Sequence, residues 1–257
     1  IESKMVEIMD TTLRDGEQTS GVSFAAHEKL NIAQVLLSDL GVNRVEIASA
    51  RVSDGEFEAV KRVAAWAERT GNLHKLEVLG FVDGDASLNW IESAGCRVVN
   101  LLCKGSYKHV TEQLRKLPEQ HIADIRSVVS LATERGIEVN IYLEDWSNGM
   151  RFSPDYVYEM VDTLKREPIR RFMIPDTLGV LNPDDCYAFC RDMVERYPAA
   201  FRLPRAQRLR SGGRQRRRSR QSRSAGHPYD RQRIGRTGRE CAAVERNRRV
   251  ERPPESA

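Results

Sequence analysis

Short apolar stretches alternate with longer amphipathic stretches along about the first 200 residues of the chain. Stretches rich in β-branched and large apolar residues predict six strands, at residues 6–9, 44–49, 75–81, 98–103, 138–144 and 171–177. Apolar residues spaced three or four apart predict five helices, at residues 26–40, 56–69, 122–135, 154–166 and 183–196. Such alternation is typical of a parallel sheet that is covered on both faces.

The helix expected at residues 26–40 shows the amphipathic pattern clearly. Its apolar face is predicted to hold Leu30, Ala33, Leu37 and Leu40. Gly41 follows it, at a position where a left-handed helix cap favours glycine.

Six strand–helix units are fewer than a closed barrel needs, because a (β/α)8 TIM barrel has eight. The pattern stops after Tyr197, where arginine, glycine, serine and proline replace the apolar residues. The expected fold class is therefore α/β, with an incomplete (β/α)8 barrel at residues 1–201 followed by a disordered, arginine-rich tail at residues 202–257.

The net charge of +4 conceals two regions of opposite sign. Residues 199–257 hold 18 arginines, no lysine and five acidic residues, so they carry +13, and the rest of the chain carries −9. No apolar run is long enough to span a bilayer, and the five cysteines form no C-x-x-C pair. These features favour a cytoplasmic protein without a disulfide framework.

The first predicted strand leads into M-D-T-T-L-R-D-G-E-Q-T at residues 9–19. In a parallel barrel the carboxyl ends of the strands carry the chemistry, so Arg14 and Asp15 lie where catalytic groups belong. A carboxylate there can hold a divalent metal, and a guanidinium can stabilise an oxyanion. On R-D-G alone, the alternative of a turn with a surface ion pair would prevail.

The longer string T-T-L-R-D-G-E-Q resembles the signature of the DRE-TIM metallolyases, which include isopropylmalate, citramalate and homocitrate synthases and hydroxymethylglutaryl-CoA lyase. Three further positions match in the expected order: Glu46 in V-E-I-A-S, Glu144 in Y-L-E-D-W-S-N-G and Thr177 in I-P-D-T-L-G. The resemblance implies that Glu46 pairs with Arg14, that Glu144 acts near the acetyl-CoA methyl group, and that Thr177 contacts a keto acid. Taken singly, they could be a structural ion pair, a strand-end acid and a turn hydroxyl.

The resemblance implies a Claisen condensation of acetyl-CoA with an α-keto acid, as in leucine and isoleucine biosynthesis. It implies a divalent metal (Mn, Mg, Co or Zn), which Asp15 would help to bind, and stabilisation of the oxyanion by Arg14. The intact family member is expected to be a homodimer.

The keto acid depends on a pocket with which Leu79, Leu102 and Tyr142 align. Large residues there favour pyruvate, the substrate of (R)-citramalate synthases, over 2-oxoisovalerate, the substrate of 2-isopropylmalate synthases. The alternative is that the three residues are ordinary barrel core. A pocket that differs by a methyl group discriminates by only about 1–3 kcal/mol.

The tail lacks two motifs of the family, an H-x-H that completes the metal site and a G-x-G-E-R-A-G-N. With suitable codons, residues 202–215 read one base later encode D-F-H-A-H-N-D-Y-D-L-A-V-G-N, and residues 226–243 at the same offset encode a segment containing G-L-G-E-R-A-G-N. We therefore predict a frameshift just after Phe201, and an inactive or impaired chain because Asp15 lacks its two histidine partners. The competing interpretation, an Arg/Ser nucleic-acid-binding tail, is less favoured because it has no interleaved aromatic residues.

Overall fold

Six parallel strands form a single curled sheet in the computed structural model, which describes residues 7–198 and residue 200. The strands pair in sequence order, and they are β1 (Met9–Asp10), β2 (Arg44–Ser49), β3 (Leu76–Phe81), β4 (Val98–Lys104), β5 (Glu138–Glu144) and β6 (Ile169–Met173). Within the described residues, β1 and β6 are therefore the two edges of the sheet. The predicted fold class, a partial barrel of about six strand–helix units, is confirmed for this part of the chain.

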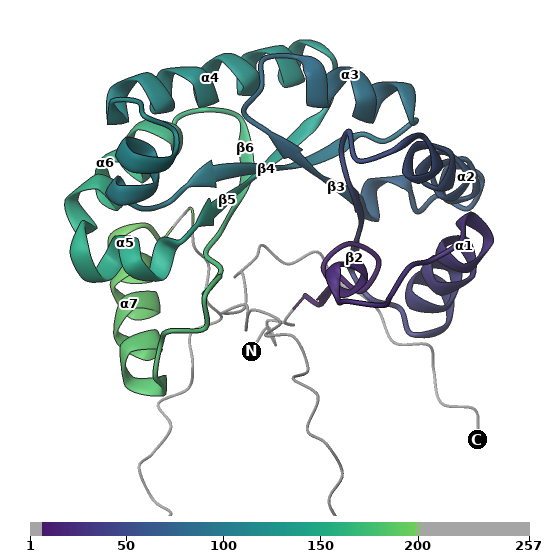
Figure 1. Cartoon of the computed structure of the whole chain (residues 1–257), viewed down its shortest axis with the longest axis horizontal. Helices are drawn as coiled ribbons and strands as arrows, with labels where there is room; N and C mark the ends of the chain where they lie inside the picture. The colour runs from purple at the N-terminus through teal and green to yellow at the C-terminus, as the bar shows by residue number, and fades with distance from the viewer. Residues whose placement is uncertain (1–6, 199, 201–257) are drawn as a thin grey trace, which may run out of the picture.

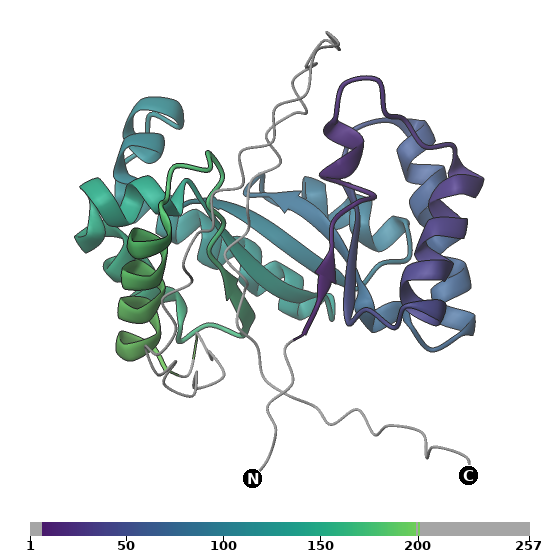
Figure 2. The ribbon, with the colours of Figure 1, turned by 90° about the horizontal axis from the view of Figure 1, so that it is seen from below.

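Helices cover the outer side of the curve, as Figure 1 shows. They are α1 (Ala26–Gln34), α2 (Asp54–Arg69), α3 (Ala86–Ser93), α4 (Pro118–Glu134), α5 (Trp146–Phe152), α6 (Pro154–Leu164) and α7 (Pro183–Arg196). Seen from below, β1 and the end that runs from β6 into α7 lie on opposite sides of the molecule (Figure 2). No helix in the described part of the chain is both long and apolar enough to cross a membrane.

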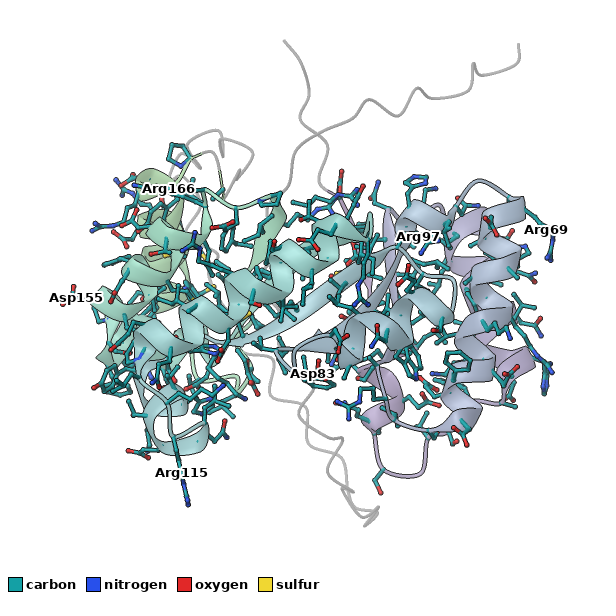
Figure 3. The ribbon with its side chains drawn as sticks, turned by 90° about the horizontal axis from the view of Figure 1, so that it is seen from above. Arg69, Asp83, Arg97, Arg115, Asp155 and Arg166 are labelled. Atoms are coloured by element: carbon teal, nitrogen blue, oxygen red, sulfur yellow. The ribbon has the colours of Figure 1, made fainter. Side chains whose placement is uncertain are left out.

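After each strand, a helical connection brings the chain back to the edge of the sheet where that strand began. All six strands are therefore parallel. Figure 3 shows the result on the outer surface, where Arg97, just before β4, and Asp83, just after β3, lie at opposite edges. Arg115 lies at the same edge of the sheet as Asp83, whereas Arg166, which follows α6, lies at the same edge as Arg97. The edge marked by Asp83 and Arg115 holds the carboxyl ends of the strands, where a barrel of this type carries its site.

Strand register sorts the inward-facing residues into layers, because alternate side chains point to the same face. On β4 and β5 the paired positions are Asn100 with Asn140, Leu102 with Tyr142, and Lys104 with Glu144. On β6, Arg171 is in register with Asn140 and Met173 with Tyr142. From the amino to the carboxyl ends of the strands, the interior therefore changes from polar to apolar and then to charged.

Several boundaries differ from the predictions. The described part of the first strand is Met9–Asp10, and the sixth strand is Ile169–Met173 rather than 171–177, so Thr177 lies in the loop after it. The helices α3 and α5 were not predicted, and both are short, at eight and seven residues. A histidine in a helical segment is exposed by default, but His121 is buried, and its Nε2 accepts a hydrogen bond from the Lys104 backbone N–H at 3.1 Å.

The helix predicted at residues 26–40 changes its winding partway. It is α-helical from Ala26 to Gln34 and then π-helical over Val35–Asp39, where the Leu40 N–H reaches the Val35 carbonyl at 2.9 Å. The wider turn rotates the following side chains around the axis. Leu37 is buried as predicted, but Leu40 is 67% exposed, so its predicted place on the apolar face was wrong.

The predicted disordered tail, the proposed frameshift and the nucleic-acid alternative concern residues 202–257. These residues lie outside the described part of the chain, so the domain boundary after residue 201 stays a prediction.

Candidate active site

Arg14 and Glu46 form a close ion pair at the end of β1. Arg14 belongs to the motif loop, which is residues 11–19 after that strand. The Arg14 Nε donates to Glu46 Oε2 at 2.5 Å, and Arg14 Nη1 donates to Asp15 Oδ1 at 3.0 Å. The loop wraps around one acceptor, because the backbone N–H groups of Arg14, Asp15 and Gly16 all point at the Thr11 carbonyl, 2.8–3.2 Å away. The Glu46 side chain is fully buried, whereas the Arg14 side chain keeps 12% of its surface exposed. The predicted pairing of Glu46 with Arg14 is therefore present in the structure.

A chain of amides continues from Glu46 through the barrel interior. Asn100 Nδ2 donates to Glu46 Oε1 at 2.7 Å, and Asn140 Nδ2 donates to Asn100 Oδ1 at 2.8 Å. Arg171 Nη1 then lies 3.4 Å from Asn140 Oδ1. Both carboxylate oxygens of Glu46 are thus occupied by donors, which fixes the position of the group that holds Arg14. The sequence reasoning missed the two asparagines, although each lies two residues before a predicted pocket residue, Leu102 or Tyr142.

Burial dominates the electrostatics of Glu46. Desolvation raises the pKa of Glu46 to about 7, against the opposing effects of the Arg14 charge and the Asn100 hydrogen bond. The pKa of Arg14 is also raised; its own burial opposes that rise, and the nearby Glu46, Tyr142 and Asp15 favour it. The guanidinium therefore stays charged, while Glu46 changes its charge near neutral pH.

This arrangement predicts that stability depends on the protonation of Glu46. Because the folded-state pKa of about 7 exceeds the model-compound value of 4.5, the folded protein retains a proton that the unfolded chain has already lost. The free energy of unfolding should therefore fall as pH rises between these two values, with Glu46 contributing on the order of 3 kcal/mol. Urea unfolding of the wild type and of E46Q at pH 5, 6, 7 and 8 checks this, and E46Q should show the smaller decline.

A matched control for that series is E138Q, because Glu138 is 54% exposed and pairs with Arg170 at the surface. Its pH profile should follow that of the wild type. An E46Q profile that is parallel to the wild type would contradict the assignment.

The three predicted pocket residues lie together. Leu79 and Tyr142 form a small buried cluster with Met173, separate from the main core, and Met9 and Leu102 pack against it. Tyr142 also lies close enough to Arg14 to contribute to the raised pKa of Arg14. The cluster is the apolar layer of the interior, next to the Arg14–Glu46 pair, and its contact with a substrate stays a prediction.

Glu144 lies at the carboxyl end of β5, in the charged layer. Its carboxylate forms an ion pair with the Lys104 ammonium, which comes from the neighbouring position on β4. Both side chains are partly exposed, at 23% and 18%. Lys104 was missed from the sequence, although it lies two residues after Leu102 and so had to share its face.

Thr177 is tied to the residue next to Glu144. The Asp145 backbone N–H donates to Thr177 Oγ1 at 3.2 Å, and Asp145 itself has a left-handed backbone, with φ of 62°. The Asp145 carboxylate accepts hydrogen bonds from Ser106 Oγ and Asn148 Nδ2, both at 2.7 Å, and lies 3.4 Å from His109 Nε2. Four polar contacts thus hold a strained backbone in place, and they bring Thr177 beside the end of β5. The predicted residues Glu144 and Thr177 therefore share one rim.

The described residues supply only part of a metal site. Asp15 offers a carboxylate that is 31% exposed, but within residues 7–198 no three histidine, cysteine or acidic side chains gather as metal ligands. His27 and His74 are exposed on the surface. The described donor set does not by itself fit a bound divalent ion, and the metal role of Asp15 stays a prediction.

Comparison with known proteins supports the motif-based interpretation. A protein from Methanopyrus kandleri that is named an (R)-citramalate synthase is 34% identical over 191 residues, covering 74% of this chain and 36% of that protein. A protein from Ignicoccus hospitalis that is named a 2-isopropylmalate synthase is 37% identical over 183 residues, covering 70% of this chain and 43% of that protein. The chain thus spans less than half the length of these curated relatives.

The solved structures agree on the fold. The crystal structure of the HMG-CoA lyase from Brucella melitensis superposes with a TM-score of 0.59 at 18% identity, over 76% of this chain and 70% of that chain. Residues 5–203 match the HMGL-like family. Because this match runs through all six strands and through the motif after β1, the chain belongs to the HMGL-like family.

Proposed function

We propose that this half-barrel carries the keto-acid and acetyl-CoA site of a synthase that condenses acetyl-CoA with pyruvate to give (R)-citramalate. The observation that carries the proposal is the stacking of three groups in one interior: the Arg14–Glu46 pair, the apolar layer around Leu79 and Tyr142, and Glu144 at the rim. A cation, a small apolar pocket and a carboxylate are what a Claisen condensation of an α-keto acid requires. The names of the two relatives support the same reaction class.

In the proposed reaction, Glu144 accepts a proton from the acetyl-CoA methyl group. The electrons of that C–H bond form the enolate, whose carbon attacks the ketone carbon, and the new C–C bond turns the ketone oxygen into an alkoxide. Arg14 stabilises the alkoxide with N–H groups beyond those that contact Glu46 and Asp15, because a guanidinium has five. The alkoxide then takes the proton that Glu144 holds. Water cleaves the thioester, its hydroxyl going to the carbonyl carbon and its proton to the CoA sulfur, and the products are citramalate and CoA. No step is assigned to a metal, since the described residues complete no site for one.

The size of the side chains in the apolar layer supports pyruvate as the keto acid. Leu79, Leu102, Tyr142 and Met173 are all large, and Leu79 and Tyr142 are only 6% and 4% exposed. Such a layer suits a methyl group better than the isopropyl group of 2-oxoisovalerate. The second candidate is therefore 2-isopropylmalate synthase activity, which the Ignicoccus relative supports by name. The proposal places the protein in isoleucine or leucine biosynthesis, as a cytoplasmic homodimer.

The activity is tested by thiol detection of CoA release, with acetyl-CoA and each keto acid in the presence of Mn or Mg. The chain as printed should release CoA only at background, because its sequence lacks the H-x-H whose two histidines would join Asp15 in the family's metal site. A protein whose reading frame is shifted by one base after Phe201 should release CoA, with about 10–200-fold higher kcat/KM for pyruvate than for 2-oxoisovalerate.

Two variants of the frame-shifted protein complete this test. R14M should lose the activity, whereas R126M, which alters a surface pair with Glu167, should keep it. Preference for 2-oxoisovalerate would favour the second candidate, and no CoA release with either keto acid would rule out both. Release by the chain as printed would contradict its expected inactivity.

A further inference from the structure

Lys29 is a fully buried lysine in α1 that the proposed reaction does not use. Its relative exposure is 0%, although lysine is rarely buried unless its charge is paired. The Lys29 Nζ lies 2.6 Å from Glu17 Oε2 and 2.6 Å from Glu56 Oε1. It also lies 3.0 Å from the Leu13 carbonyl and 3.3 Å from the Ile47 carbonyl. One ammonium, with three N–H donors, therefore serves four acceptors.

The two carbonyls have a special position in the chain. Leu13 immediately precedes Arg14, and Ile47 immediately follows Glu46. Lys29 thus joins the backbone of the motif loop to the backbone of β2, directly beside the two residues whose side chains meet at 2.5 Å. A charged donor binds carbonyls more strongly than a neutral one. Lys29 therefore contacts the backbone next to both members of the Arg14–Glu46 pair.

The two carboxylates extend the same connection. The Glu17 Oε1 atom accepts the Phe24 backbone N–H at 2.9 Å while Oε2 binds Lys29, so Glu17 closes the loop between the motif and α1. Glu56 lies in α2 and links the ammonium to the next helix. Burial raises the pKa of Glu56, while Lys29 opposes that rise. Lys29 therefore lies where the motif loop, β2, α1 and α2 meet.

We infer that Lys29 is a positioning residue for Arg14, acting through the Leu13 and Ile47 carbonyls rather than as a simple counter-ion of Glu56. A lysine suits this place because its compact ammonium can turn its donors toward acceptors in several directions, whereas a guanidinium is planar. The inference deepens the proposed function, and only its kinetic consequence rests on that function.

The first test uses the chain as printed and needs no activity. Hydrogen exchange of the Arg14 Nε–H, assigned by its loss in R14K, is followed by NMR in the wild type, K29M, K29Q and E56Q. In K29M and K29Q the exchange should speed up about tenfold or more, because the Arg14–Glu46 bond is no longer held. In E56Q, which leaves both carbonyl contacts, it should change by less than about threefold. Amides of β4 and β5 report that each variant is folded.

Unchanged Arg14 exchange in a folded K29M or K29Q would overturn the inference. Equal acceleration in E56Q would also overturn it, because Lys29 would then act only as a counter-ion. K29Q retains a side-chain donor, so it serves if K29M does not fold.

The second test uses the frame-shifted protein. K29Q should lower kcat by about 100-fold through misplacement of Arg14, with KM for acetyl-CoA nearly unchanged. An unchanged kcat would overturn the kinetic consequence of the inference. If the frame-shifted wild type itself releases no CoA, the proposed function fails while the exchange test still decides the role of Lys29.

Discussion

Replacing Arg14 by methionine should lower the free energy of unfolding by about 2 kcal/mol at pH 8, where Glu46 is ionised in the wild type. The substitution removes the cationic partner of a fully buried carboxyl group, so Glu46 takes up a proton at pH 8 that it does not hold in the wild type, while the Asn100 amide still donates to it. At pH 5 the loss should be about 1 kcal/mol, because Glu46, with a pKa of about 7, is already protonated in the wild type. Urea unfolding at the two pH values measures both numbers.

The pair can be isolated by a double-mutant cycle. In the E46Q background, R14M should cost about 1 kcal/mol less at pH 8 than it costs in the wild type, because an amide has no charge to neutralise when the cation is lost. R126M is the matched surface control: Arg126 is 57% exposed and its pair with Glu167 should contribute at most about 1 kcal/mol. Equal losses for R14M at pH 5 and pH 8 would show that the Arg14 contact is not electrostatic.

Replacing Gly149 by alanine should destabilise the protein by at least about 3 kcal/mol. A Cβ atom at this position would lie 2.0 Å from the Gly105 carbonyl oxygen and 2.9 Å from Val157 Cγ2. The clash is with backbone, which cannot rotate away, and Gly105 is itself pressed against β5, with its N–H donating to the Glu144 carbonyl at 2.6 Å. Thermal and urea unfolding followed by circular dichroism measure the loss.

The matched control is G55A in α2. A Cβ atom there meets only Ser53 Oγ, at 3.9 Å, so helix propensity should dominate and the variant should be as stable as the wild type or up to about 1 kcal/mol more stable. If G149A is as stable as the wild type, the close contact between α5 and the end of β4 is contradicted. The result also concerns the site, because this contact fixes the strand end that carries Glu144.

The candidate site was largely predictable because its residues have fixed places in a repeating pattern. In a parallel barrel every strand ends at the same edge, so a motif after the first strand and acids after later strands must come together there. The structure brings Arg14 and Glu46 into contact, and it places Thr177 against the residue that follows Glu144, while their roles in a site stay predictions. The same pattern explains the apolar layer, which contains Leu79, Leu102 and Tyr142. Alternate residues of a strand share one face, and positions in register on neighbouring strands lie side by side.

Lys29 and His121 show what the pattern could not predict. A lysine at the fourth position of an amphipathic helix is usually solvated, and only the packing of α1 against the motif loop and β2 buries Lys29 among four acceptors. A helical histidine is also usually exposed, but the end of β4 reaches His121 through the Lys104 backbone N–H. Periodicity describes one element at a time, whereas these contacts join residues on different elements.

The sequence by itself determined the strand–helix alternation, the interior face of each strand and the motif that places Arg14 at the site, because these depend on residue type and local spacing. Only the tertiary structure decided that burial raises the pKa of Glu46 to about 7, that a π-helical turn exposes Leu40, and that Gly105 and Gly149 touch. Desolvation and close contact depend on which elements pack together and on the distance between them. A local pattern of residues contains no information about either.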